Sequence, residues 1–151
     1  MDERYFQLPG GEVYVAAHER SAHGRLCFRR DGRIYEVHVA RGLAAALVGD
    51  EPRSRARLAR QLGIGAETVG EVGLGTNPGA TSLPIDILDE KSLGTVHVAL
   101  GANARFGGRC RSRRHCDLIV TEPDLEVDGV LLMRRGEPRG IPAEARCAPA
   151  P

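Results

Sequence analysis

Short apolar segments separated by turn residues are the feature that most constrains the fold of this chain. Residues 12–17, 26–30 and 34–39 each have the length and the β-branched or aromatic content of a strand. The second and third segments are joined by a turn containing Asp31-Gly32, and Asp128-Gly129 likewise lies between two apolar segments. Asp-Gly between apolar segments is typical of β-hairpins. The sequence therefore predicts a domain dominated by antiparallel or mixed sheet.

Two further segments predict helices. Residues 42–48 are an Ala/Leu run and predict a short helix. Asp50 is placed to cap a second helix, which carries several arginines on its solvent-facing side and ends at Gly63. We therefore expect an α+β fold with two or three short helices.

The rest of the chain completes one domain. Residues 95–100 and 115–120 predict two more strands. We expect the domain to cover residues 1–136, followed by a loose Pro/Ala-rich tail at 137–151. The glycine-rich residues 70–79 lack the Gly-Lys-Ser/Thr of a phosphate loop, so nucleotide binding is not expected.

The composition excludes several classes of protein. Among 151 residues, 42% are hydrophobic and 27% are charged, which is typical of a globular domain. With 21 basic and 20 acidic residues, the net charge of +1 gives no field that would hold nucleic acid or anionic lipid. No apolar segment approaches the roughly 20 residues of a membrane span, and the N-terminus is charged where a signal peptide is apolar. We expect a cytoplasmic protein that binds neither nucleic acid nor membrane.

Five residues form a candidate metal-ligand set. His115 and Asp117 are two positions apart in a predicted strand, so their side chains share a face. His97 lies in an otherwise apolar strand, and Glu12 and Glu71 are acids in apolar or glycine-rich surroundings, where an unpaired carboxylate is costly to bury. Three carboxylates carry about −3, which two divalent cations with a bridging hydroxide would balance.

At these residues the sequence resembles the M29 family of metallopeptidases, which includes aminopeptidases T and S. The blocks that carry the resemblance occur in the same order over residues 8–120. They are Leu8 to Val13, Gly70-Glu71, Gly75 to Pro78, Asp89 to Lys91, Gly94 to Gly101, Gly107-Gly108 and His115 to Asp117.

The resemblance implies a truncated catalytic domain with a two-metal site that acts on peptides. Its metal ligands fall on Glu12, Glu71, His97, His115 and Asp117, with zinc, cobalt or manganese as the metal in an active enzyme. Either Glu71 or Glu12 would serve as the proton acceptor. Aminopeptidase T-like members carry a tyrosine seven residues beyond the metal-binding histidine, where this chain has Ala104, so a hydroxyl that could stabilise an oxyanion is lost.

Substrate contacts are expected from two further segments. Five arginines lie within residues 105–114, immediately before His115, and would clamp acidic side chains or the C-terminal carboxylate of a peptide if they are not simply solvated. From this loop we assign Arg105 and Arg109 to substrate binding. Asn77, in the block that follows Glu71, is assigned with them.

Three functions remain open at this point. The first is a metal-dependent aminopeptidase or related amide hydrolase. The second is an inactive, metal-free module that presents a ribosomally made precursor peptide to partner enzymes. The third is a ring-opening dioxygenase with a single Fe(II) on His97, His115 and Asp117, because dihydroxypyridine dioxygenases look similar to the M29 family. Open sheet edges predict a homodimer in each case.

Overall fold

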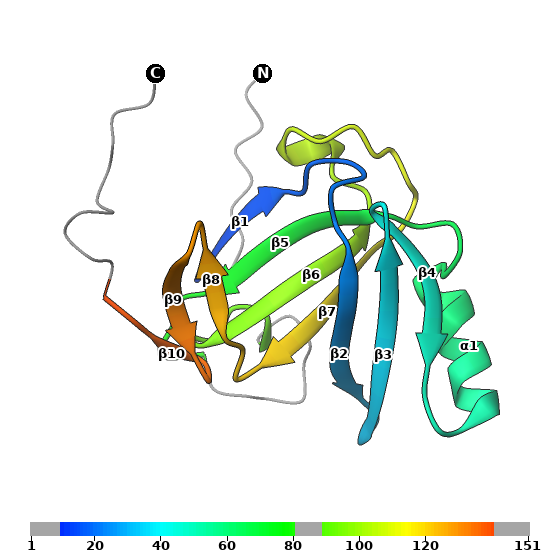
Figure 1. Ribbon diagram of the computed structural model, residues 1–151, viewed down its shortest axis with the longest axis horizontal. Coiled ribbons are helices and arrows are strands. Elements are labelled where there is room, and N and C mark those ends of the chain that lie inside the picture. The colour runs from blue at the N-terminus through cyan, green and yellow to red at the C-terminus, as the bar shows by residue number, and fades with distance from the viewer. Residues whose placement is uncertain (1–9, 81–88, 141–151) are drawn as a thin grey trace.

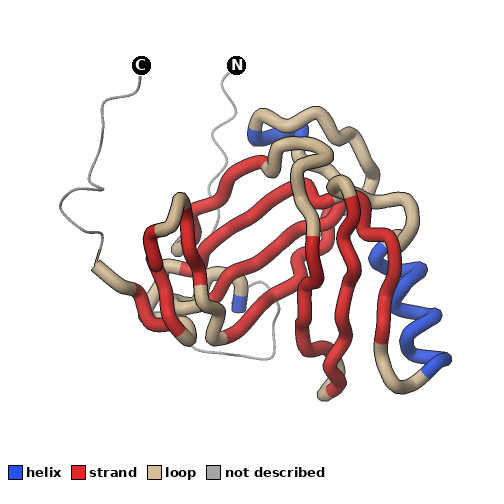
Figure 2. The backbone as a smooth tube through the Cα atoms, in the orientation of Figure 1, coloured by secondary structure: helices blue, strands red, loops and turns tan. Residues whose placement is uncertain are grey.

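The computed structural model describes residues 10–80 and 89–140, and within them the chain is mostly antiparallel β-sheet (Figures 1 and 2). The strands are β1 (Glu12–Ala16), β2 (Gly24–Arg30), β3 (Arg33–Ala40), β4 (Leu43–Val48), β5 (Val69–Gly75), β6 (Thr95–Gly101), β7 (His115–Thr121), β8 (Leu125–Val127), β9 (Val130–Arg134) and β10 (Glu137–Pro138). The helices are α1 (Pro52–Leu62) and a 3₁₀-helix, η1 (Ala104–Phe106).

The strands form three antiparallel sheets. The largest has the order β1-β5-β6-β7, the second β2-β3-β4, and the smallest β10-β9-β8. The smallest sheet lies at the opposite end of the molecule from α1 (Figure 1). The described residues contain no helix that is both long and apolar enough to cross a membrane.

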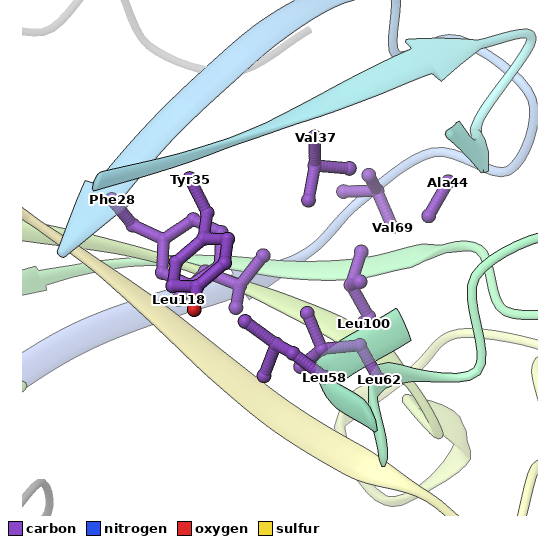
Figure 3. Close-up of a cluster of buried hydrophobic side chains, with 9 residues drawn as sticks. All are labelled: Phe28, Tyr35, Val37, Ala44, Leu58, Leu62, Val69, Leu100 and Leu118. Atoms are coloured by element: carbon purple, nitrogen blue, oxygen red, sulfur yellow. The ribbon is translucent and has the colours of Figure 1, made fainter. Parts of the chain in front are cut away.

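The hydrophobic core lies between the two larger sheets and α1. Aromatic and aliphatic side chains of the second sheet face those of the first, and two leucines of α1 close the gap (Figure 3). Its buried members are Phe28, Tyr35, Val37, Ala44, Leu58, Leu62, Val69, Leu100 and Leu118. This core uses only one face of the β1-β5-β6-β7 sheet, so the other face is free to carry polar side chains.

Helix α1 begins and ends at side-chain and glycine caps. The carboxylate of Glu51 accepts hydrogen bonds from the backbone N–H groups of Arg53 and Ser54, at 3.0 and 2.6 Å. Gly63 adopts the left-handed conformation at the other end, with φ of 68°. The prediction that the helix ends at Gly63 is confirmed, whereas the cap is Glu51 rather than Asp50.

The predicted α+β class is wrong, because α1 is the one α-helix among the elements assigned in the described ranges. The error comes from residues 42–48, where the Ala/Leu run predicted a helix and the structure has β4. This segment pairs with β3, and Ala44 is completely buried in the core. Burial and strand pairing therefore override the intrinsic helix preference of alanine and leucine.

The expected tail also differs at its start. Glu137 and Pro138 pair with Arg134 and Met133 of β9, so the loose segment does not begin directly after Gly136. Residues 141–151 of the predicted tail lie outside the described residues. The predicted strands and the hairpin around Asp128-Gly129 are confirmed.

Candidate metal centre

Strand register places the candidate ligands on one face of the β1-β5-β6-β7 sheet. Residues directly opposite each other in an antiparallel pair share a face. Gly73 of β5 lies opposite both Tyr14 and His97, and Ala99 of β6 lies opposite both Glu71 and Asp117. Glu12 and His115 are two residues from Tyr14 and Asp117 along their own strands, so they share this face. It is the face turned away from the core.

A β-bulge at Gly70 directs Glu71 to this face. In a regular strand Val69 and Glu71 would point the same way. Val69 pairs with Leu100 and faces the core, but the register then shifts and Glu71 pairs with Ala99. Gly70 is confined at the bulge, because a Cβ there would lie 2.4 Å from the carbonyl oxygen of Gly101. The glycine therefore allows the chain to turn a carboxylate away from the core.

The polar face opens into a pocket of about 530 Å³. All five predicted metal ligands line it, together with five residues from neighbouring positions. The complete lining is Glu12, Tyr14, Arg30, Glu71, Glu90, His97, Phe106, His115, Cys116 and Asp117. The structure thus brings together residues that are more than 100 positions apart in the sequence.

Glu71 lies between the two histidines at the centre of the pocket. Its Oε1 is 3.3 Å from Nε2 of His97, and its Oε2 is 3.3 Å from Nε2 of His115. Nε2 of His115 is also 3.5 Å from Oδ1 of Asp117, and Nε2 of His97 is 3.8 Å from Oε2 of Glu12. Each oxygen of the Glu71 carboxylate therefore faces a different histidine, and each histidine faces a second carboxylate.

His115 is fixed on its far side. Its Nδ1 is 2.8 Å from the backbone oxygen of Ala102, so Nδ1–H donates there and Nε2 faces the carboxylates. The ring of Phe106 packs edge-on against His115 at a centroid distance of 5.8 Å, and Tyr14 packs edge-on against Phe106 at 5.4 Å. A histidine held through one nitrogen by a backbone carbonyl is typical of metal ligands.

A buried ammonium group pairs with two carboxylates of the pocket. Nζ of Lys91 is 2.6 Å from Oε1 of Glu12 and 2.6 Å from Oε1 of Glu90, and the lysine side chain is only 1% exposed. Burial lowers the pKa of Lys91, but its hydrogen bonds to the two glutamates outweigh this and raise the pKa above its usual value. Burial, with the nearby Asp117 charge, raises the pKa of Glu90 although Lys91 opposes the shift.

The remaining charges favour a cation beside the histidines. Hydrogen bonds to Asp117 and Glu71 raise the pKa of His115 to about 11. Burial alone would raise the pKa of Glu71, but the hydrogen bonds from His115 and His97 lower it to about 2. Burial lowers the pKa of His97, and Glu71 more than compensates, so it too is raised. The carboxylates therefore stabilise positive charge at both Nε2 positions.

Within single pairs of donor atoms, the distances are those expected between two ligands of one metal ion. Two nitrogen or oxygen ligands at the usual bond length to zinc lie about 3.4 Å apart in a tetrahedral site, and the closest contacts here are 3.3, 3.3 and 3.5 Å. Within residues 10–80 and 89–140, however, no group of three or more His, Cys, Asp or Glu side chains is arranged so that it could hold a metal ion. Glu12 lies closer to Lys91, at 2.6 Å, than to His97, at 3.8 Å.

The three residues predicted to bind substrate lie outside this pocket. Asn77 hydrogen-bonds the backbone of Gly10 and Gly79 and supports the loop after β5. Arg105 lines an adjoining pocket, and the backbone N–H of Arg109 donates to Glu19 at 2.6 Å. Substrate binding by these residues remains a prediction.

Sequence reasoning missed Glu90 and Lys91 as members of the site. Both lie in the Asp89 to Lys91 block, and Lys91 is the single lysine of a chain whose other basic residues are arginines. That isolated lysine, next to two acids, was the available signal. Tyr14 and Phe106 carried no comparable signal, because their role depends on the contact with each other and with His115.

Comparison with known proteins shows the fold and no family. No family model matches the chain, and no curated protein matches it. The chain is similar to the solved structure of 2,5-dihydroxypyridine dioxygenase from Pseudomonas putida KT2440, with a TM-score of 0.74 and 18% sequence identity. The match covers 91% of this chain and 46% of the dioxygenase, so the chain spans about half the length of that enzyme.

Proposed function

We propose that this chain is an M29-like metal-dependent domain that removes an N-terminal residue from peptides or hydrolyses a related amide. The observation that carries the proposal is the position of Glu71, whose two oxygens each lie 3.3 Å from a different histidine. A carboxylate shared in this way suits two neighbouring cations rather than one.

The residues that would hold the metals are the five that resemble the family's ligands. Glu71, His97 and Glu12 lie at one end of the cluster, and Glu71, His115 and Asp117 at the other. Two divalent cations there would polarise a carbonyl group and lower the pKa of a water molecule.

The chain's own residues would supply binding and proton transfer. Of the four carboxylates that line the pocket, Glu12 and Glu90 already pair with Lys91, so a free peptide N-terminus would bind there as a neutral amine on a metal rather than as an ammonium ion. Tyr14 and Phe106 form an aromatic wall beside His115. Glu71, at 4% exposure, or Glu12 would accept the proton of the attacking water.

The test is hydrolysis of a library of short peptides with free N-termini in the presence of zinc, cobalt or manganese. We expect Glu71→Gln and Asp117→Asn, which preserve side-chain size, to abolish turnover. Glu126→Gln is the matched control, because Glu126 is exposed on β8. Turnover that is unchanged in the Glu71 and Asp117 variants would refute the proposal.

The second candidate is a ring-opening dioxygenase with one Fe(II). It is favoured by the fold shared with 2,5-dihydroxypyridine dioxygenase and by the common face of His97, His115 and Asp117, a two-histidine, one-carboxylate set. Oxygen consumption with a pyridine-diol or catechol-like compound, dependent on Fe(II) and lost in Asp117→Asn, would support this candidate. If the wild type with Fe(II) takes up no oxygen with any of these compounds, the dioxygenase candidate is rejected.

Peptide binding without turnover would instead support the inactive module. In that case peptides bind at micromolar concentration, and no divalent metal produces a product. Partner enzymes would then act on the bound peptide. A homodimer remains a proposal for each of the three functions, and size-exclusion chromatography with light scattering tests it.

A further inference from the structure

A second pocket, of about 630 Å³, adjoins the candidate metal centre. It lies between η1 and the loop that leads into β7, and it shares Phe106 and His115 with the first pocket. His115 therefore lines both the pocket of the ligand cluster and the second pocket. A molecule that fills both would pass beside the His115 and Phe106 rings.

The two pockets differ in charge. Four carboxylates and Arg30 line the first, but Lys91 pairs with two of these carboxylates and the two histidines face the others. Four arginines line the second, and its lining among the described residues includes no acid. These arginines are Arg105, Arg111, Arg113 and Arg114. The site as a whole is therefore a carboxylate-lined pocket and a basic pocket that meet at one histidine.

The loop that carries the arginines is tied to the sheet. Oδ1 of buried Asn103 accepts the backbone N–H of Cys110 at 2.8 Å, and its Nδ2 donates to the backbone oxygen of Gly70 at 3.0 Å. Ser112 donates to buried Glu67 at 2.7 Å. The same asparagine therefore anchors both the loop and the bulge that directs Glu71 into the metal centre.

Arg114 is partly neutralised by a carboxylate, and Ala104 leaves space in the basic pocket. Nη1 of Arg114 is 3.5 Å from Oε1 of Glu67. Arg111 and Arg113 are exposed on the loop. Ala104 contributes only a methyl group to the lining, at the position where the resemblance expects a tyrosine.

From this arrangement we infer that the basic pocket binds the carboxylate of a short peptide whose N-terminal amine enters the carboxylate-lined pocket. Guanidinium groups bind carboxylates through paired, charge-assisted hydrogen bonds. The carboxylate of such a peptide matches the charge of the basic pocket. This inference names the substrate class of the proposed hydrolase and rests on that function, while the binding itself needs no turnover.

Binding is measured by isothermal titration with three probes, Ala-Ala, Ala-Ala amide and Ala-Glu amide. The first carries a C-terminal carboxylate, the second none, and the third a side-chain carboxylate, so the probes separate the two sources. The test variant is Arg111→Gln/Arg113→Gln. The control is Arg53→Gln/Arg57→Gln, which removes the same charge from the exposed side of α1.

We expect Ala-Ala, Ala-Glu amide or both to bind about tenfold more tightly than Ala-Ala amide, because a hydrogen bond to a charged group contributes on this scale. The preference disappears in Arg111→Gln/Arg113→Gln and persists in Arg53→Gln/Arg57→Gln. The single variants, each expected to lose part of it, provide a second comparison. Equal affinity of the wild type for all three probes would overturn the inference. So would a carboxylate preference that is unchanged in Arg111→Gln/Arg113→Gln.

The same titrations with Glu71→Gln separate this inference from the proposed function. A carboxylate preference that survives in Glu71→Gln supports the basic pocket whether or not the protein hydrolyses peptides. Turnover of peptides without any carboxylate preference would support the hydrolase and overturn the inference.

Discussion

The imidazole of His97 lies directly over Gly73 of the neighbouring strand, where a Cβ would come within 2.2 Å of its Cε1 and Nε2 atoms. Gly73 lies opposite His97 in the register of β5 and β6. A side chain at residue 73 would therefore displace the nitrogen that faces Glu71. The position of a candidate ligand depends on the absence of a side chain on the adjacent strand.

Gly73→Ala is expected to weaken zinc binding about 10- to 100-fold, the range seen when residues that orient a metal ligand are changed. Gly140→Ala is the matched control, since a Cβ at residue 140 meets nothing within 4 Å. Isothermal titration with zinc measures both variants. Equal affinity of Gly73→Ala and the wild type would show that the His97 ring need not hold its position.

Lys91→Met is expected to reduce the free energy of unfolding by about 3 kcal/mol, because it leaves two buried carboxylates without their shared cation. Glu12 and Glu90 are each 2.6 Å from the lysine nitrogen that would be lost. Urea denaturation measures the change. A variant as stable as the wild type would mean that the two glutamates gain little from the ammonium group.

Ala104→Tyr is expected to raise peptide turnover about 100-fold if the domain is a hydrolase, because one oxyanion-stabilising donor contributes on this scale. Residue 104 is in η1, two residues from the ring of Phe106 that packs on His115. Ala104→Phe provides the same ring without the hydroxyl. If both variants raise kcat equally, the hydroxyl is not the cause.

The Glu51 cap makes a contribution to stability that depends on pH. Hydrogen bonds from Ser54 and from the backbone of Arg53 lower the pKa of Glu51 below its usual value. Its stabilisation is therefore complete above the unfolded-state pKa of about 4.3 and is lost as the pH falls through the lower folded-state value. We expect Glu51→Ala to lower Tm at pH 7 and to differ less from the wild type in acid. A Tm difference that grows in acid would contradict this.

Local sequence patterns predicted the strands that alternate and the helix that ends at glycine. They did not predict β5, because its glycine-rich residues were assigned to no strand. Contacts with distant residues require its glycines, because Gly70 packs on the backbone of Gly101 and Gly75 packs on the backbone of Ser92. No local pattern contains those contacts. The segment of β4 failed for a related reason, since pairing with β3 determines its structure.

The candidate site was predictable in its residue types but not in its balance of charge. The five expected residues lie in one pocket. Sequence alone did not indicate that Lys91 would form ion pairs with two carboxylates of that pocket. Nor did it indicate that a bulge at Gly70 would turn Glu71 toward the histidines. Both effects arise from tertiary contacts.

The metal content of the purified protein tests the central claim most directly. Elemental mass spectrometry is applied to protein prepared without chelator or nickel affinity, beside Glu71→Gln and the exposed control Glu126→Gln. The account predicts two divalent metals per chain in the wild type and the control, with loss from Glu71→Gln. No bound metal after addition of zinc, manganese or cobalt would contradict it, and a single iron would favour the dioxygenase instead.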